Sequence, residues 1–110
     1  CQGRASQTAM IHRIIFRHTA RRDFFDACEW YNQRRAGLGS RFEAAVERTL
    51  EMISAAPISF PVVHRDVRRA LVRRFPYGLF YRVRGETIHV LAVLHSRRDP
   101  ALWRSRTDAE

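Results

Sequence analysis

Lysine is missing from this 110-residue chain, and all 20 of its basic side chains are arginines. Set against 11 acidic residues, they give a formal net charge of +9 and a pI near 11.3. Guanidinium groups form two-point hydrogen bonds with carboxylates and phosphates, and they stack on aromatic rings. A surface this basic favours an anionic partner, and charge alone leaves open whether it is a nucleic acid or an acidic protein segment.

Cysteines and long apolar runs are also scarce. The two cysteines, Cys1 and Cys28, make no disulfide framework, which favours a reducing, cytoplasmic location. No apolar run approaches the ~20 residues needed to cross a bilayer, so we expect no membrane partner. Residues 1–9 lack periodicity, and we expect a non-native or disordered leader there, one domain over 10–106 and a tail over 107–110.

Motifs that hold metals or cofactors are absent from the sequence. His12, His18, His64 and His89 are scattered without the spacing of metal ligands. No glycine-rich phosphate loop and no nucleophile elbow occurs. We therefore expect neither a metal site nor a cofactor.

Periodicity predicts a strand followed by two helices. The β-branched and aromatic stretch Met10–Arg17 is typical of a strand. A first helix is expected from a Thr19 cap to Gly37, with Asp23 in its first turn. A capping box at Ser40–Glu43 predicts the start of a second helix. That helix should end before Pro57, because proline disfavours helical geometry in the preceding residue. One helix stripe is Phe24, Ala27, Cys28 and Tyr31, and the other is Phe42, Val46, Thr49, Leu50 and Ile53.

The second half of the chain has the alternation of strands. After a loop over 58–66, strands are predicted at Val67–Phe75, at Leu79–Arg84 and over 88–95, the last two joined by a tight turn over 84–87. The last strand is apolar on both faces, as expected when both are covered. A loop with about one helical turn follows. The order β-α-α-β-β-β indicates an α+β fold, with a helical hairpin on one face of a small, mainly antiparallel twisted sheet.

Three segments occur in a family's order and spacing: WYNQRRAGLGSRFEAAVERTLEMI, RRFPYGLFYRV and VLAVLHSRRDPALW. They contain Trp30-Tyr31, Gly37-Leu38-Gly39, Phe75-Pro76-Tyr77 and a His95…Arg97…Asp99-Pro100…Trp103 ending. Together they resemble the ParE/RelE superfamily of toxins from bacterial type II toxin–antitoxin modules, which include plasmid stabilisation proteins. The resemblance runs from about Ile11 to Arg106 and implies the same β-α-α-β-β-β order.

The resemblance implies a cytoplasmic toxin that forms a hetero-oligomer with a cognate antitoxin, ParD-like or similar, through the antitoxin's acidic C-terminal segment. RelE-like members are ribosome-dependent mRNA endonucleases, whereas ParE-like members poison DNA gyrase. Two basic positions of the ribonuclease pattern persist as Arg69 and Arg97. Three depart from it, since Leu71 and Gly78 replace basic residues and Trp103 replaces a tyrosine. These losses favour a non-enzymatic, gyrase-directed toxin.

A second ribonuclease branch uses a histidine near the end of the last strand, so His95 could act with Arg97, Arg73 or Arg69, and with Glu43 or Glu47 as remote bases. The simpler interpretation of His95 is a strand-end residue bonded to a neighbour such as Asp99. The favoured hypothesis is a surface that binds the target or the antitoxin, with Trp103 or Trp30 as exposed anchors. Its candidate residues are Arg69, Arg73, Arg97, Arg98, Trp103, Arg104 and Arg106.

Overall fold

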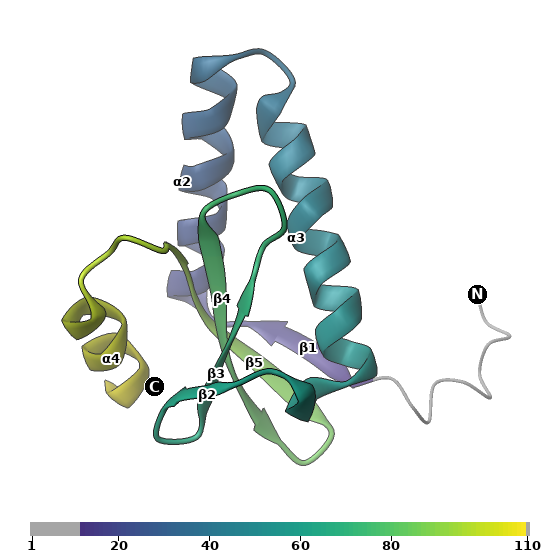
Figure 1. The fold of residues 1–110 in the computed structure, drawn as a ribbon, viewed down its shortest axis with the longest axis vertical. Coiled ribbons are helices and arrows are strands. Elements are labelled where there is room, and N and C mark those ends of the chain that lie inside the picture. The colour runs from purple at the N-terminus through teal and green to yellow at the C-terminus, as the bar shows by residue number, and fades with distance from the viewer. Residues whose placement is uncertain (1–11, 110) are drawn as a thin grey trace, which may run out of the picture.

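A computed structural model describes residues 12–109 of the chain (Figure 1). Its strands are β1 (Arg13–Phe16), β2 (Val62–His64), β3 (Val67–Leu71), β4 (Tyr77–Arg84) and β5 (Thr87–His95). Its helices are α2 (His18–Arg34), α3 (Leu38–Ala55), the short 3₁₀ helix η1 (Pro57–Ser59) and α4 (Pro100–Ala109). The expected leader over residues 1–9 lies outside the described residues, as does the beginning of the predicted first strand at Met10.

The strands form one mixed sheet in the order β1-β5-β4-β3-β2. β1 runs parallel to β5, and the other neighbours are antiparallel. The tight turn predicted between β4 and β5 is confirmed, with Arg84 paired to Thr87 and Gly85 at φ +61°. The α+β prediction is therefore confirmed, with two additions that the sequence did not predict: the three-residue edge strand β2 and a full C-terminal helix.

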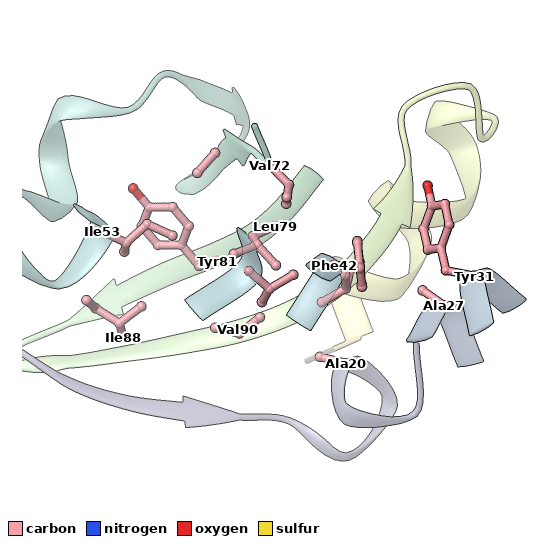
Figure 2. Close-up of a cluster of buried hydrophobic side chains, with 13 residues drawn as sticks. Ala20, Ala27, Tyr31, Phe42, Ile53, Val72, Leu79, Tyr81, Ile88 and Val90 are labelled. Carbon is pink, nitrogen blue, oxygen red and sulfur yellow. The ribbon is translucent and has the colours of Figure 1, made fainter. Parts of the chain in front are cut away.

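One face of the sheet is covered by the α2–α3 hairpin, whose far end extends beyond the sheet (Figure 1). The predicted stripes are confirmed, because Ala27, Tyr31, Phe42 and Val46 are buried in one cluster (Figure 2). Leu79, Tyr81, Ile88 and Val90 meet them from β4 and β5. This cluster is the main core and fixes the hairpin against the two central strands.

Both predicted helix starts are wrong. Ser40 lies inside α3, which begins at Leu38 behind Gly37, and no side chain of the N-cap residue bonds the helix end. The Gly39 amide instead donates to the Asn32 side chain of α2 at 2.8 Å. Gly37 has φ +86°, so the chain turns sharply enough for α3 to begin two residues earlier. Likewise α2 begins at His18, and Thr19 gives no cap.

The opposite face carries α4 on β5 (Figure 1). Asp99 caps this helix, since its carboxylate accepts from the Ala101 amide at 2.9 Å. The Trp103 ring stacks on Phe80 with centroids 4.7 Å apart and is only 6% exposed. α4 continues past Arg106, the expected end of the domain, and Thr107 is fully buried. A second, smaller core of Val67, Phe80, Leu91, Ala92, Leu94 and Trp103 thus closes the sheet from behind.

Two strand boundaries also differ from the expectation. β3 ends at Leu71, so Arg73 does not continue the alternation that was expected to place it beside Arg69. The chain turns instead through residues 72–76, where Arg74 has φ +72°. β4 begins at Tyr77, two residues earlier than predicted. The shorter β3 moves Arg73 and Arg74 into a turn at the end of the sheet.

Candidate functional site

Two turns meet at one end of the sheet, and together they carry four arginines. The β3–β4 turn carries Arg73 and Arg74, and the loop after β5 carries Arg97 and Arg98. The Ser96 amide donates to the Pro76 carbonyl at 2.7 Å and ties the turns together. All four arginines are exposed. We call Arg73, Arg74, Arg97 and Arg98 the arginine end.

His95 lies beside this end, on the side of the sheet that faces the helical hairpin. It pairs with Tyr77, whose side chain packs on the main core, and the two rings are 5.4 Å apart. Its Nδ1 accepts from the Arg97 amide at 3.0 Å, so in the neutral ring the proton is on Nε2. Asp99 was expected to bond to His95, but its carboxylate caps α4 instead.

A groove of about 560 Å³ opens between α2 and the ends of β4 and β5. Tyr31 and Tyr77 line it, and burial raises the pKa of both phenols above the ordinary value, so both hydroxyls are protonated at neutral pH. Trp30 stands at the same groove, 47% exposed, with the Arg34 guanidinium 4.2 Å from its ring centroid. The remaining lining residues are Asp23, Asp26, Ala27, Pro76, Val93, Leu94, His95 and Arg98.

Arg69 points away from His95. It pairs with Phe80, whose ring belongs to the second core behind the sheet. The aliphatic part of Arg69 lies over Gly78, because a Cβ built on Gly78 would be 3.2 Å from both Cγ and Cδ of Arg69. Leu71 follows on the same face and is 62% exposed. Arg69 and His95, two members of the alternative catalytic set, therefore lie on opposite faces.

The remote carboxylates are not near His95 either. Glu43 and Glu47 line a separate hollow of about 510 Å³ between β1 and the helical hairpin. Its other walls are apolar side chains such as Phe24 and Leu50. The structure thus gives His95 no carboxylate from α3.

Two residues of the expected binding surface hold α4 in place instead. Trp103 was expected as an exposed anchor, but its stacking on Phe80 buries it. Arg106 donates to the Asp23 carboxylate of α2 at 2.5 Å, with both side chains largely buried. Asp23 also accepts from the Val93 amide at 3.1 Å, where β5 extends beyond β1. Asp23 was expected in the first turn of α2. It lies beyond that turn instead, and it connects α2 to β5 and α4.

Arg104 is the exposed candidate on α4, with its guanidinium 5.4 Å from the centroid of the Trp103 ring. The sequence prediction missed Arg74, although it is next to Arg73, because both were assigned to a strand, in which neighbouring side chains point to opposite faces. It also missed the groove, since the groove joins residues from α2 to others more than forty positions later in the chain. The doublets Arg73-Arg74 and Arg97-Arg98 were the available signal.

Residues 12–109 hold no group of three or more histidine, cysteine, aspartate or glutamate side chains placed to bind a metal ion. Within the same residues, every helix is too short or too polar to traverse a lipid bilayer.

Residues 14–100 match a family model described as the ParE toxin of the type II toxin–antitoxin system parDE. The chain belongs to this family. It is a toxin of a type II toxin–antitoxin system in the ParE/RelE superfamily, as the sequence motifs implied. No curated protein matches the chain.

Solved structures of related systems agree with the ParE fold. The chromosomal ParDE system of P. aeruginosa superimposes with a TM-score of 0.69 at 14% identity, over 78% of this chain and 97% of the other. The RelBE2 toxin–antitoxin complex of Mycobacterium tuberculosis superimposes with a TM-score of 0.57 at 29% identity, over 82% of this chain and 95% of the other. The first likeness shows the fold alone, and the second is also a likeness in sequence.

Proposed function

We propose that this ParE-family toxin acts without catalysis of its own, by binding DNA gyrase in the cytoplasm, and that a cognate antitoxin neutralises it. The observation that carries the proposal is the separation of His95 from Arg69 on the two faces of the sheet. Metal-free RNA cleavage needs proton-transfer groups and cations around one phosphate. Trp103, which stands where the ribonuclease pattern has tyrosine, is also buried.

Protein partners are expected to contact the exposed arginines Arg73, Arg97, Arg98 and Arg104. Exposed guanidinium groups bind carboxylates in two-point fashion, and they steer an acidic antitoxin segment toward the toxin. The other three candidates are engaged within the fold instead: Arg69 packs over Gly78, Trp103 stacks on Phe80, and Arg106 pairs with Asp23.

A ribosome-dependent mRNA endonuclease is the second candidate. Two observations favour it: the 29% identity to the RelBE2 complex, and the place of His95 in one groove with Tyr77 and Arg98, where the His95 and Tyr77 rings are 5.4 Å apart. In that case His95 would transfer a proton while Arg97 or Arg98 stabilised the phosphate.

Expression of the toxin in bacteria tests the two candidates in one experiment. Gyrase-dependent DNA breaks and mRNA integrity are followed in the same cells, the latter by primer extension. We expect DNA breaks with intact mRNA, and the purified chain should inhibit supercoiling by purified gyrase. Codon-phased mRNA cuts that disappear in His95→Ala would overturn the gyrase proposal. Loss of DNA breaks in Arg97→Gln/Arg98→Gln, at unchanged protein level and unchanged melting temperature, would support the proposed surface.

A further inference from the structure

The two-helix hairpin separates its charges along its length. Its tip, which we define as residues 30–42, contains Arg34, Arg35 and Arg41 and no acidic residue. The rest of the hairpin, residues 18–29 and 43–55, contains three arginines and six acidic residues. The tip therefore has a formal charge of +3 and the rest has −3. The basic tip is thus a local feature and not only a part of the chain's general excess of arginine.

The fold makes little use of the tip arginines. Arg34, Arg35 and Arg41 are exposed, and none of them forms an ion pair within residues 12–109. Arg34 suits its place in the last turn of α2. Arg41 lies near the N-terminus of α3, where the helix dipole favours negative charge and disfavours a guanidinium group. Carboxylates of a partner would supply the negative charge that the tip lacks.

The hairpin tip is a rigid projection. It extends beyond the sheet (Figure 1). Within it the Tyr31 and Phe42 rings lie 5.3 Å apart, and Phe75 of the β3–β4 turn packs against them at 5.0 and 5.2 Å. The hydrogen bond from the Gly39 amide to the Asn32 side chain holds the two helices together at the link. A surface that is ordered before binding loses little conformational entropy when a partner contacts it.

One large aromatic side chain is exposed beside the tip arginines. Trp30 is 47% exposed, and the Arg34 guanidinium lies 4.2 Å from its ring centroid. Tyr31 packs edge-on against the same ring, with centroids 5.1 Å apart. Tryptophan and arginine are the residue types that most often dominate the binding energy of protein interfaces. The tip therefore combines positive charge with an aromatic anchor.

We propose that the hairpin tip inserts into an acidic recess of the toxin's protein target, with Trp30 as the anchor and the three tip arginines on carboxylates. The proposal rests on the proposed function, because it takes DNA gyrase as that target. It adds a second contact to the one proposed for the arginine end. A convex projection fits a preformed site in a folded partner, whereas an antitoxin segment that folds on binding needs an extended apolar surface.

A nucleic acid fits the tip less well than an acidic protein surface does. A strand is a long polyanion, and beyond the tip it would meet the exposed carboxylates of Glu29 and Glu43 and then others along the hairpin. Like charges at these positions repel it. A protein partner presents its carboxylates in a limited patch, which can end where the charge of the hairpin reverses.

Paired charge variants test the tip with purified gyrase. Arg35→Gln/Arg41→Gln removes one tip arginine from each side of the link. Arg22→Gln/Arg48→Gln is the matched control, because it removes one exposed arginine from each helix outside the tip. The tip variant should need at least about tenfold more protein to inhibit supercoiling, and the control less than about threefold more. Equal losses in the two variants would show attraction by net charge and overturn the proposal.

The anchor has a matched control on the same hairpin. Trp30→Ala should weaken the inhibition at least about tenfold. Met52 is also largely exposed, at 57%, but it lies at the other end of α3, so Met52→Ala should change the inhibition less than about threefold. Full inhibition by Trp30→Ala would overturn its role as the anchor.

Two measurements separate the tip from the stability of the fold and from the antitoxin. Arg41→Gln should melt at the same temperature as the unmodified chain or higher, because it removes a positive charge from the N-terminal part of α3. The affinity of Arg35→Gln/Arg41→Gln for the cognate antitoxin should change less than about threefold. Loss of antitoxin affinity with intact gyrase inhibition would assign the tip to the antitoxin and overturn the proposal.

A photo-crosslinking residue on the tip identifies the partner surface directly. Ser40→benzoylphenylalanine places the reactive group on an exposed tip position. It should crosslink to a gyrase subunit without DNA, to a peptide rich in aspartate or glutamate. The same group at Ala55, which is exposed at the other end of α3, should give no such product. Crosslinks that form only when DNA is present would contradict a protein contact.

Growth arrest in bacteria distinguishes failure of this proposal from failure of the proposed function. Where the unmodified toxin and the Arg35→Gln/Arg41→Gln variant inhibit gyrase equally, the tip proposal is overturned and the gyrase proposal stands. Where the unmodified toxin leaves gyrase active, gyrase is not the target. The tip is then supported as the target contact if the tip variant fails to arrest growth while Arg22→Gln/Arg48→Gln arrests it, and overturned if both arrest it.

Discussion

Two glycines in the link between α2 and α3 are there for different physical reasons. A Cβ on Gly39 would come 2.5 Å from the Cys28 carbonyl oxygen and 2.6 Å from the Asn32 side chain. A Cβ on Gly37 would meet nothing within 4 Å, but this residue has φ +86°. Gly39 therefore permits two helices to approach, and Gly37 permits a backbone turn.

This distinction predicts opposite responses to side-chain size. Gly39→Ala should cost about 1–3 kcal/mol, because the helices must separate. Gly37→Ala should cost about 1–2 kcal/mol from backbone strain alone. Asparagine tolerates positive φ, so Gly37→Asn should recover stability relative to Gly37→Ala, whereas Gly39→Asn should be worse than Gly39→Ala. Urea unfolding of the four variants measures this. The same ranking at both positions would contradict the assignment.

Tyr81 predicts a pH dependence at the alkaline end. Its hydroxyl donates to the Pro57 carbonyl at 2.6 Å, its side chain is fully buried, and burial raises its pKa to about 12 from an ordinary value of 10. The raised pKa means that this contribution to stability is fully present below pH 10. It is lost as the pH rises toward 12, because the unfolded chain ionises first.

Tyr81→Phe should therefore cost about 1–3 kcal/mol at neutral pH, since the buried Pro57 carbonyl loses its donor. The difference from the unmodified chain should shrink as the pH rises above 10. Urea unfolding at several alkaline pH values gives the comparison, and absorbance at high pH follows phenol ionisation directly. A difference that stays constant through this range would show that Tyr81 ionises equally readily in the folded and unfolded chains.

At the scale of elements, the C-terminal helix was the feature least predictable from the sequence. The segment SRRDPALWRSR has weak helical periodicity, and its aromatic residue resembled a surface anchor. The helix forms because Asp99 caps it, Pro100 suits its first position, and the Trp103 ring stacks on Phe80 of the sheet. The first two signals are local and readable, whereas the third depends on a strand that lies far back in the sequence.

Asp23 joins three elements, and its removal should loosen α4. Asp23→Asn keeps an oxygen for the Val93 amide but removes the charge that pairs with Arg106, so we expect a loss of about 1.5–3 kcal/mol in urea unfolding. Asp26→Asn is the matched control on the same helix and should change stability by less than about 0.5 kcal/mol, since Asp26 is exposed. Arg106→Gln should cost about as much as Asp23→Asn, and the double variant should cost less than the sum. Strict additivity would show that the pair does not act as a unit.

Strand content was predictable where alternation is long. β4 and β5 were recognised because Leu79, Tyr81 and Val83 share one face and because β5 is apolar on both. β2 was missed since its three residues offer no period, and β3 was overextended since the arginines after Leu71 mimic alternation. The order of elements thus follows from the sequence, whereas the placement of Arg73 and Arg97 at the same end of the sheet depends on the turns.

At the scale of the whole molecule, the charge of +9 should govern how fast an antitoxin is captured. The association rate with the cognate antitoxin, measured by stopped flow, should fall at least about tenfold between roughly 0.05 and 0.5 M salt, because screening shortens the reach of the toxin's field. The dissociation rate should change less. Arg97→Gln/Arg98→Gln should lower the rate at low salt and flatten its salt dependence. An association rate independent of salt would contradict electrostatic steering.

The parallel pairing of β1 with β5 has a consequence for synthesis. β5 lies between β1 and β4, and it pairs with both, yet it is the last strand to leave the ribosome. Until then β1 lacks the strand with which it pairs, and α2 lacks the strand on which it packs. The arginine end, which needs the loop after β5, is assembled later still. The complete sheet, and with it the arginine end, therefore forms only after β5 has been synthesised.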